Sequence, residues 1–199
     1  MGTHAEQLRN KIESKQAVVA IIGLGYVGLP LLAAFHEAGY PVLGFDIDPE
    51  KPVLLKKGEN YLPHLGADMC KPFVGSKRFD ATTDPKALQK ADAIIVCVPT
   101  PLGQHGEPDL SYVVNTGVMI GENSREGQLV VLESTSYPGT TREDMLPAML
   151  KAAAKKGVNL NLGDNVFVAF SPEREDPGRK SHTTTTIPKL VGGLDKISG

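Results

Sequence analysis

Short apolar runs alternate with helical patterns along most of this sequence. The runs are rich in Val, Ile, Leu and Phe, which is typical of strands buried on both faces of a sheet. They cover residues 17–22, 42–46, 93–98, 128–133 and 165–170, and less apolar strands are predicted at 78–84 and 187–193. Between them, apolar residues recur every three or four positions, or Pro and Gly mark helix ends. These signals predict helices at 27–38, 49–58, 84–91, 110–123 and 140–156.

This order predicts the fold class. Strands that alternate with helices, and that are mostly apolar, form a parallel sheet covered on both faces. Right-handed crossovers then produce a Rossmann-type, doubly wound α/β domain with a mostly parallel sheet and helices on both faces.

The first residues form a separate unit. Ala5, Leu8 and Ile12 recur at helical spacing in an otherwise polar stretch. We therefore predict an N-terminal lead-in helix within residues 1–16, packed on a dinucleotide-binding domain over residues 17–199.

Two predictions concern local structure. Thr140 and Glu143 have the spacing of a capping box at the start of a helix, and Pro147 should kink or delay that helix. Residues 59–77 show no regular pattern and are expected to be irregular.

Composition and charge exclude several classes of function. The chain has 199 residues, 41% of them apolar, and a net charge of −2. It has no basic footprint for nucleic acid, no apolar run long enough to cross a membrane, and no apolar signal-peptide core near its start, so we expect a cytoplasmic protein. Cys70 and Cys97 lack the spacing of a metal or redox pair and are expected to be reduced, with Cys97 buried. No metal site is predicted.

The strongest chemical signal is the motif G-x-G-x-x-G after the first predicted strand. Gly23 permits the sharp bend, Gly25 lets the backbone approach a pyrophosphate, and Gly28 permits close packing of the helix on the sheet. A glycine-rich turn alone is weak evidence. Asp46, however, lies at the end of the second strand, where a carboxylate binds the adenosine ribose and repels the extra phosphate of NADP. The combination predicts NAD.

Six segments occur in the order of a known family: "GLGYVGLP", "GFDID", "CVPTPL", "EPDLSYV", "ESTSYPGTT" and "FSPEREDPG". Together they resemble the N-terminal half of the UDP-glucose/GDP-mannose dehydrogenase family, and most of all its branch that oxidises UDP-N-acetylhexosamines such as UDP-N-acetylglucosamine. The resemblance implies an enzyme that oxidises C6 of a nucleotide sugar from alcohol to carboxylate in two NAD-dependent steps.

The resemblance also implies roles in cofactor binding. Tyr26 and Val27 would lie under the pyrophosphate, and Asp46 and Lys51 would hold the adenosine ribose. Thr100 would contact the cofactor at the carboxyl edge of the sheet. A solvated lysine on a helix face is the alternative for Lys51, and a loop threonine for Thr100.

Three more residues would work near the reacting carbon. The family match places Ser134 and Thr135 on the nicotinamide side, where their hydroxyls would position a water, and makes Glu173 the acid/base group. A structural Ser/Thr-rich turn is the alternative for the first two, and a surface glutamate for Glu173.

The resemblance also indicates which parts lie outside this sequence. The family's catalytic cysteine, its active-site lysine and asparagine, most of the sugar pocket and the dimer interface come later in the chain, and neither Cys70 nor Cys97 occupies the place of that cysteine. We expect this chain to bind NAD without turning over alone, and the full-length protein to bind a UDP-sugar and form a homo-oligomer.

Two other functions remain open from the sequence. One is the N-terminal domain of a β-hydroxyacid dehydrogenase, which also begins with a strand and "GLG". The other is a non-catalytic NAD-sensing module.

Overall fold

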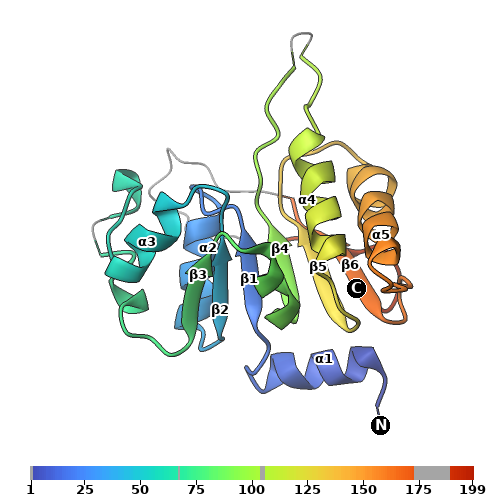
Figure 1. Ribbon diagram of the computed structural model, residues 1–199, viewed down its shortest axis with the longest axis horizontal. Coiled ribbons are helices and arrows are strands. Elements are labelled where there is room, and N and C mark those ends of the chain that lie inside the picture. The colour runs from blue at the N-terminus through green and yellow to red at the C-terminus, as the bar shows by residue number, and fades with distance from the viewer. Residues whose placement is uncertain (1, 67, 104–105, 173–188) are drawn as a thin grey trace.

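The computed structural model describes residues 2–66, 68–103, 106–172 and 189–199. Within these residues, seven strands form one sheet in the order β3-β2-β1-β4-β5-β6-β7 (Figure 1). All neighbours pair in parallel except β6 and β7. The strands are β1 (Val19–Ile22), β2 (Val42–Phe45), β3 (Phe79–Thr82), β4 (Ala93–Val96), β5 (Gln128–Leu132), β6 (Val166–Phe170) and β7 (Gly192–Gly193). The sheet confirms the predicted doubly wound fold.

Helices cover both faces of this sheet. The α-helices are α1 (His4–Glu13), α2 (Gly28–Glu37), α3 (Glu50–Lys57), α4 (Ser111–Glu122) and α5 (Leu146–Lys155). Shorter helical segments are η1 (Pro63–Leu65), η2 (Lys71–Phe73), η3 (Pro85–Lys90) and η4 (Thr141–Met145). Helices α4 and α5 pack against one face, while α2 lies on the other (Figure 1).

The core explains why β1 is apolar at every position. Ala20 and Ile22 pack into the cluster under α4 and α5, whereas Val19 and Ile21 pack into the cluster under α2. All four side chains are buried, because each face of the strand meets its own helical layer.

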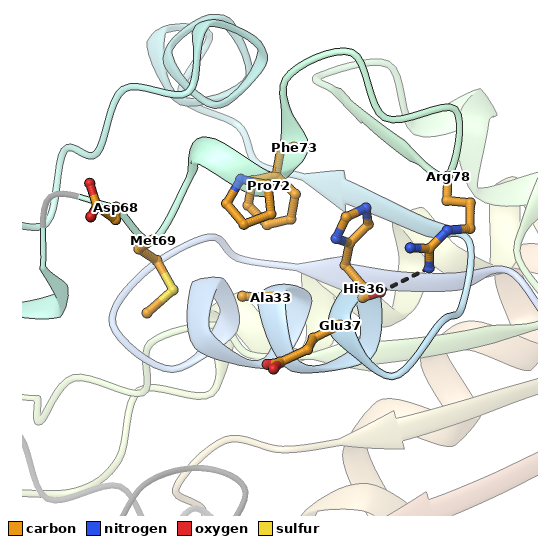
Figure 2. A pocket seen from close by; sticks show the side chains of 8 residues that line it. All are labelled: Ala33, His36, Glu37, Asp68, Met69, Pro72, Phe73 and Arg78. Carbon is orange, nitrogen blue, oxygen red and sulfur yellow. Dashed lines mark hydrogen bonds between the residues drawn. The ribbon is translucent and has the colours of Figure 1, made fainter.

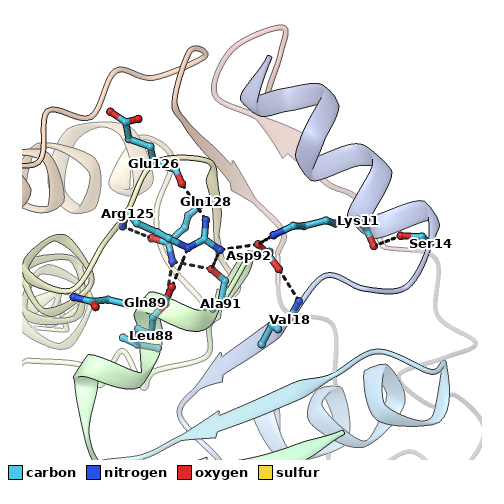
Figure 3. A network of polar contacts seen from close by, with 10 residues as sticks. All are labelled: Lys11, Ser14, Val18, Leu88, Gln89, Ala91, Asp92, Arg125, Glu126 and Gln128. Atoms are coloured by element: carbon cyan, nitrogen blue, oxygen red, sulfur yellow. Dashed lines mark hydrogen bonds and ion pairs between the residues drawn. The ribbon is translucent and has the colours of Figure 1, made fainter. Parts of the chain in front are cut away.

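The predicted lead-in helix, α1, lies at the amino ends of the strands (Figure 1). Its Lys11 Nζ is 2.8 Å from Oδ1 of the buried Asp92, and Arg125 reaches the same oxygen at 2.6 Å (Figure 3). The backbone amide of Val18 donates to the other carboxylate oxygen at 3.0 Å. Burial alone would raise the pKa of Asp92, but these hydrogen bonds outweigh it and hold the pKa below its ordinary value.

The predicted capping box at Thr140 is wrong. Thr140 has helical backbone angles, and its hydroxyl donates to the Tyr137 carbonyl at 2.9 Å instead of capping a helix. A π-helical segment, η4, follows directly. Pro147 lies in the first turn of α5, so the predicted delay of that helix is confirmed.

Two other elements differ from their predicted form. The helix at 84–91 is the 3-10 helix η3, because six residues beginning at a proline close few α-helical hydrogen bonds. Asp84 caps it, accepting from the Lys86 amide at 3.0 Å. The strand at 187–193 is reduced, within the described residues, to the two antiparallel residues of β7.

Candidate functional site

The turn between β1 and α2 has the close contacts that the glycine motif predicts. Gly23 has a φ of +91°, and a Cβ there would lie 2.4 Å from the Cys97 carbonyl oxygen. A Cβ on Gly28 would lie 1.8 Å from the carbonyl oxygen of Gly23. Side chains are therefore sterically excluded at both positions.

Gly25 differs from its two neighbours in the motif. A Cβ there would meet no protein atom within 4 Å among the described residues, so this backbone faces open space. Tyr26, half exposed, and Val27, partly buried, follow it. Helix α2 begins at Gly28, and the first amides of a helix are free to bind an anion. The turn thus offers an unobstructed backbone beside a helix N-terminus.

Asp46 lies directly after β2 and is only 6% exposed. Its Oδ2 accepts a hydrogen bond from the Leu24 amide at 2.8 Å, and its Oδ1 accepts from the Asp48 amide at 3.0 Å. The carboxylate therefore joins the glycine turn to the end of the second strand.

Lys51, on α3, points toward the same carboxylate. Its Nζ lies 2.8 Å from Oδ2 of Asp46, and its side chain is 26% exposed. The structure thus brings Asp46 and Lys51 together. A lysine that was only solvated on a helix face would not need this contact. A carboxylate has about four acceptor positions, of which three are used here, so one remains for a ligand hydroxyl.

Sequence reasoning missed Tyr61 because it lies in the irregular stretch 59–77. Its hydroxyl donates to the carbonyl of Leu24, a residue of the glycine turn, at 2.7 Å. Burial, and then the charge of Asp46, raise the pKa of Tyr61. The tyrosine is therefore neutral and acts as a hydrogen-bond donor that supports the turn.

The carboxyl ends of β4 and β5 bring together the remaining predicted residues that the structure describes. Thr100 donates through Oγ1 to the Thr135 carbonyl at 2.5 Å, and the Thr135 side chain is exposed. Ser134 is 4% exposed, and its hydroxyl lies 3.3 Å from the Val96 carbonyl. The Ser134 hydroxyl thus has a structural contact. Glu173 lies outside the described residues.

A separate cavity of about 480 Å³ lies beside α2 (Figure 2). It is lined by the second half of α2 and by the segment from 68 to 78, so it contains none of the predicted site residues. His36, on its wall, lies 2.7 Å from the Ser76 hydroxyl, and Arg78 donates to the His36 carbonyl at 2.9 Å.

Two features are absent from the described part of the chain. It contains no helix with the length and apolar character needed to cross a membrane. Nor does it contain a group of three or more His, Cys, Asp or Glu side chains placed to hold a metal ion.

Comparisons with known proteins place the chain in one family. Residues 17–199 match the UDP-glucose/GDP-mannose dehydrogenase family, NAD binding domain. The chain is 36% identical over 179 residues to UDP-N-acetyl-D-glucosamine 6-dehydrogenase of Pseudomonas aeruginosa, covering 90% of this chain and 40% of that protein. It is 33% identical to UDP-N-acetyl-D-mannosamine dehydrogenase of Campylobacter jejuni, with 88% and 43% covered.

A solved structure shows the same arrangement. The UDP-D-ManNAc dehydrogenase of Pyrococcus horikoshii superposes with a TM-score of 0.79 at 31% identity, covering 91% of this chain and 42% of that one. The chain thus spans less than half the length of these relatives. The match covers most of the chain and includes the glycine turn and Asp46. The chain therefore belongs to the UDP-glucose/GDP-mannose dehydrogenase family, whose NAD-binding domain it contains.

Proposed function

We propose that the β1–α2 turn seats the pyrophosphate of NAD and that Asp46 and Lys51 hold its adenosine ribose. The observation that supports this most directly is the placement of Asp46. Its carboxylate accepts a hydrogen bond from the glycine turn and also pairs with Lys51, next to the open backbone of Gly25.

The residues present fit the cofactor. One acceptor position on Asp46 is left for a ribose hydroxyl, and Lys51 has two N–H groups left to donate to the second hydroxyl. A ribose diol matches this pair of groups. A 2′-phosphate would instead place a dianion beside the carboxylate, which favours NAD over NADP.

Calorimetric titration of this chain with NAD, NADP and ADP-ribose tests the assignment. We expect NAD and ADP-ribose to bind and NADP to bind more weakly. Equal or tighter binding of NADP would contradict the role of Asp46, and failure of all three to bind would contradict the site itself.

We further propose that the full-length protein is an oxidoreductase that acts on a UDP-N-acetylhexosamine, with UDP-N-acetylglucosamine as the first candidate. NAD would accept hydride from C6 in each of two oxidations, from alcohol to aldehyde and from aldehyde to carboxylate. The relatives support the hexosamine, since they include a UDP-N-acetyl-D-glucosamine 6-dehydrogenase and a UDP-N-acetyl-D-mannosamine dehydrogenase. The family match favours this reading over a β-hydroxyacid dehydrogenase or a non-catalytic NAD sensor.

The substrate is tested by NADH formation with the full-length protein. UDP-N-acetylglucosamine, UDP-N-acetylmannosamine and UDP-glucose are compared at equal concentration by kcat/KM. A preference for UDP-glucose would contradict the hexosamine assignment, and a preference for the manno epimer would correct the first candidate.

Two residues are proposed for the chemical step. Thr135, exposed in the turn after β5, would position a water, and Glu173 would act as the acid/base group. Replacing Glu173 with Gln in the full-length protein should then lower kcat more than it changes the Kd for NAD, whereas a surface glutamate would change neither.

We also propose that residues 17–199 form the NAD-binding domain, that 1–16 form its lead-in helix, and that the full-length protein is a homo-oligomer. Sedimentation of the full-length protein tests the last point, since a monomer would contradict it.

A further inference from the structure

A buried ion pair lies at the carboxyl end of β5, away from the adenosine end of the site. Glu133 immediately follows β5 and is 4% exposed, and its carboxylate pairs with the ammonium group of Lys189, whose side chain is 22% exposed. Lys189 precedes β7, so the pair joins two segments that are far apart in the sequence.

Around Lys189, the charged side chain is partly buried and the apolar side chains beside it are exposed. The two apolar residues that follow, Leu190 and Val191, are 63% and 64% exposed, whereas the lysine is turned inward. Apolar side chains ordinarily take the buried positions and lysine the exposed ones. Hydrophobic packing therefore does not explain why this segment turns its lysine toward Glu133.

Stability does not explain the pair either. Removing two charges from water costs free energy that their attraction seldom exceeds, and apolar pairs of similar volume are often as stable. Burial lowers the pKa of Lys189, in keeping with this cost. What such a pair does provide is a defined geometry between the groups that it joins.

Two buried serine hydroxyls in the segments that follow β5 and β6 lack a hydrogen-bond partner among the described residues. Ser171 follows β6 beside Glu133, where its amide donates to the Leu132 carbonyl at 3.0 Å, and it is 2% exposed. Within the described residues, the buried hydroxyls of Ser171 and Ser136 have no hydrogen-bond partner. Buried hydroxyls of this kind normally bond to something, so a polar ligand or ordered water is expected here.

The position in the sheet indicates which ligand. The adenosine end of the site lies at β1 and β2, and a dinucleotide extends across the carboxyl edge of a doubly wound sheet. The other half of a bound NAD would therefore lie over the ends of β4, β5 and β6. Glu133 directly precedes Ser134 and Thr135 at that edge.

We propose that Glu133 and Lys189 are positioning residues for the nicotinamide half of NAD. The ion pair fixes the distance between the Ser134–Thr135 turn and the segment before β7. The polar groups that the nicotinamide ring would contact are therefore in place before NAD binds. This inference rests on the proposed NAD site. It concerns the nicotinamide end alone, because the adenosine end has its own contacts at Asp46.

The test compares two ligands that differ only at the proposed end. NAD contains the nicotinamide ring, whereas ADP-ribose has the same adenosine, pyrophosphate and second ribose without it. The variants are Glu133→Gln, Lys189→Met and the double variant, which leaves no lone buried charge. Lys11→Met is the matched control. It also removes the lysine of an ion pair with a buried carboxylate, that of Asp92, but this pair lies at the amino ends of the strands.

We expect each of the three variants to weaken NAD binding about fivefold and to change ADP-ribose binding less than about twofold, as for loss of one coupled pair. The control should lower the melting temperature and leave the ratio of the two affinities unchanged. Equal losses for both ligands, or a double variant that binds NAD like the wild type, would overturn the proposal. Failure of the wild type to bind either ligand would instead reject the NAD site.

A second measurement does not depend on the variants folding. In the wild-type chain, the side-chain NMR signal of Lys189 should shift when NAD is added and stay in place when ADP-ribose is added. A signal that responds equally to both ligands, or to neither, would contradict the positioning role.

Discussion

Oδ2 of Asp46 lies 2.8 Å from the Leu24 amide and 2.8 Å from Nζ of Lys51. A single carboxylate oxygen thus joins the glycine turn after β1, the end of β2 and the helix α3. This contact makes the orientation of Asp46 independent of any ligand, so the acceptor that a ribose would meet is preformed.

Replacing Asp46 with Asn should weaken NAD binding and relax the choice of cofactor. The amide keeps the size of the side chain but removes the charge that pairs with Lys51 and repels a 2′-phosphate. We expect the Kd for NAD to rise about tenfold or more, the cost of a hydrogen bond to a charged group, and the NADP/NAD preference to move toward NADP. Titration calorimetry with both nucleotides measures this.

Asp80→Asn is the matched control for that variant. It removes an exposed carboxylate on β3 that pairs with Lys56 at 2.8 Å. An exposed pair contributes little, so both affinities should stay at wild-type values. If the two Asp variants had the same effect on nucleotide binding, the role of Asp46 would be refuted.

The glycines of the motif should respond differently to the same added methyl group. In Gly25→Ala, the Cβ meets no described protein atom within 4 Å, so the melting temperature should hold while NAD affinity falls, because the methyl occupies the path of the ligand. Gly28→Ala should unfold the domain at lower temperature, because its Cβ would lie 1.8 Å from a carbonyl oxygen.

Gly192→Ala on β7 serves as the neutral control, since its Cβ also meets no described atom within 4 Å. Thermal melts with and without NAD separate these effects. A Gly25→Ala chain that binds NAD normally would contradict the open backbone as the pyrophosphate seat.

Asp92→Asn should destabilise the fold by about 2 kcal/mol, because it weakens charged hydrogen bonds to Lys11, Arg125 and the Val18 amide. The pKa of Asp92 is lowered in the folded state, so the folded protein binds this proton less readily than the unfolded chain. The stabilisation is therefore complete above the unfolded pKa of about 3.9 and is lost as pH falls through the lower folded value. Urea unfolding at pH 7 and below pH 4 should show a smaller difference between variant and wild type in acid.

His36 should make stability depend on pH in a higher range. Burial, followed by the charge of Arg78, lowers its pKa from 6.5 in the folded state. The neutral ring is favoured on folding, so stability is complete above pH 6.5 and declines as pH falls below it. The variant His36→Gln can keep the contact to Ser76 without titrating.

Melting temperatures from pH 7.5 to pH 5 provide the check on His36. The wild type should lose more stability over this range than His36→Gln, because its unfolded chain takes up a proton that the buried ring of the folded protein binds less readily. Identical slopes would show that the ring titrates alike in the folded and unfolded chains.

The sequence alone determined the order of elements and the chemistry of the glycine turn. Apolar runs such as 17–22 mark strands buried on both faces. Gly23 is required by its φ of +91°, and Gly28 by its contact with the Gly23 carbonyl in the same turn. These features are local, so spacing and residue type were sufficient to predict them. The acid after β2 follows from the same strand–turn–helix pattern.

Only the tertiary structure decided which polar groups meet. Tyr61 supports the glycine turn from an irregular stretch, and Glu133 pairs with Lys189 across 56 positions of sequence. Such contacts depend on how distant segments pack, and packing leaves no periodic signal in a single sequence.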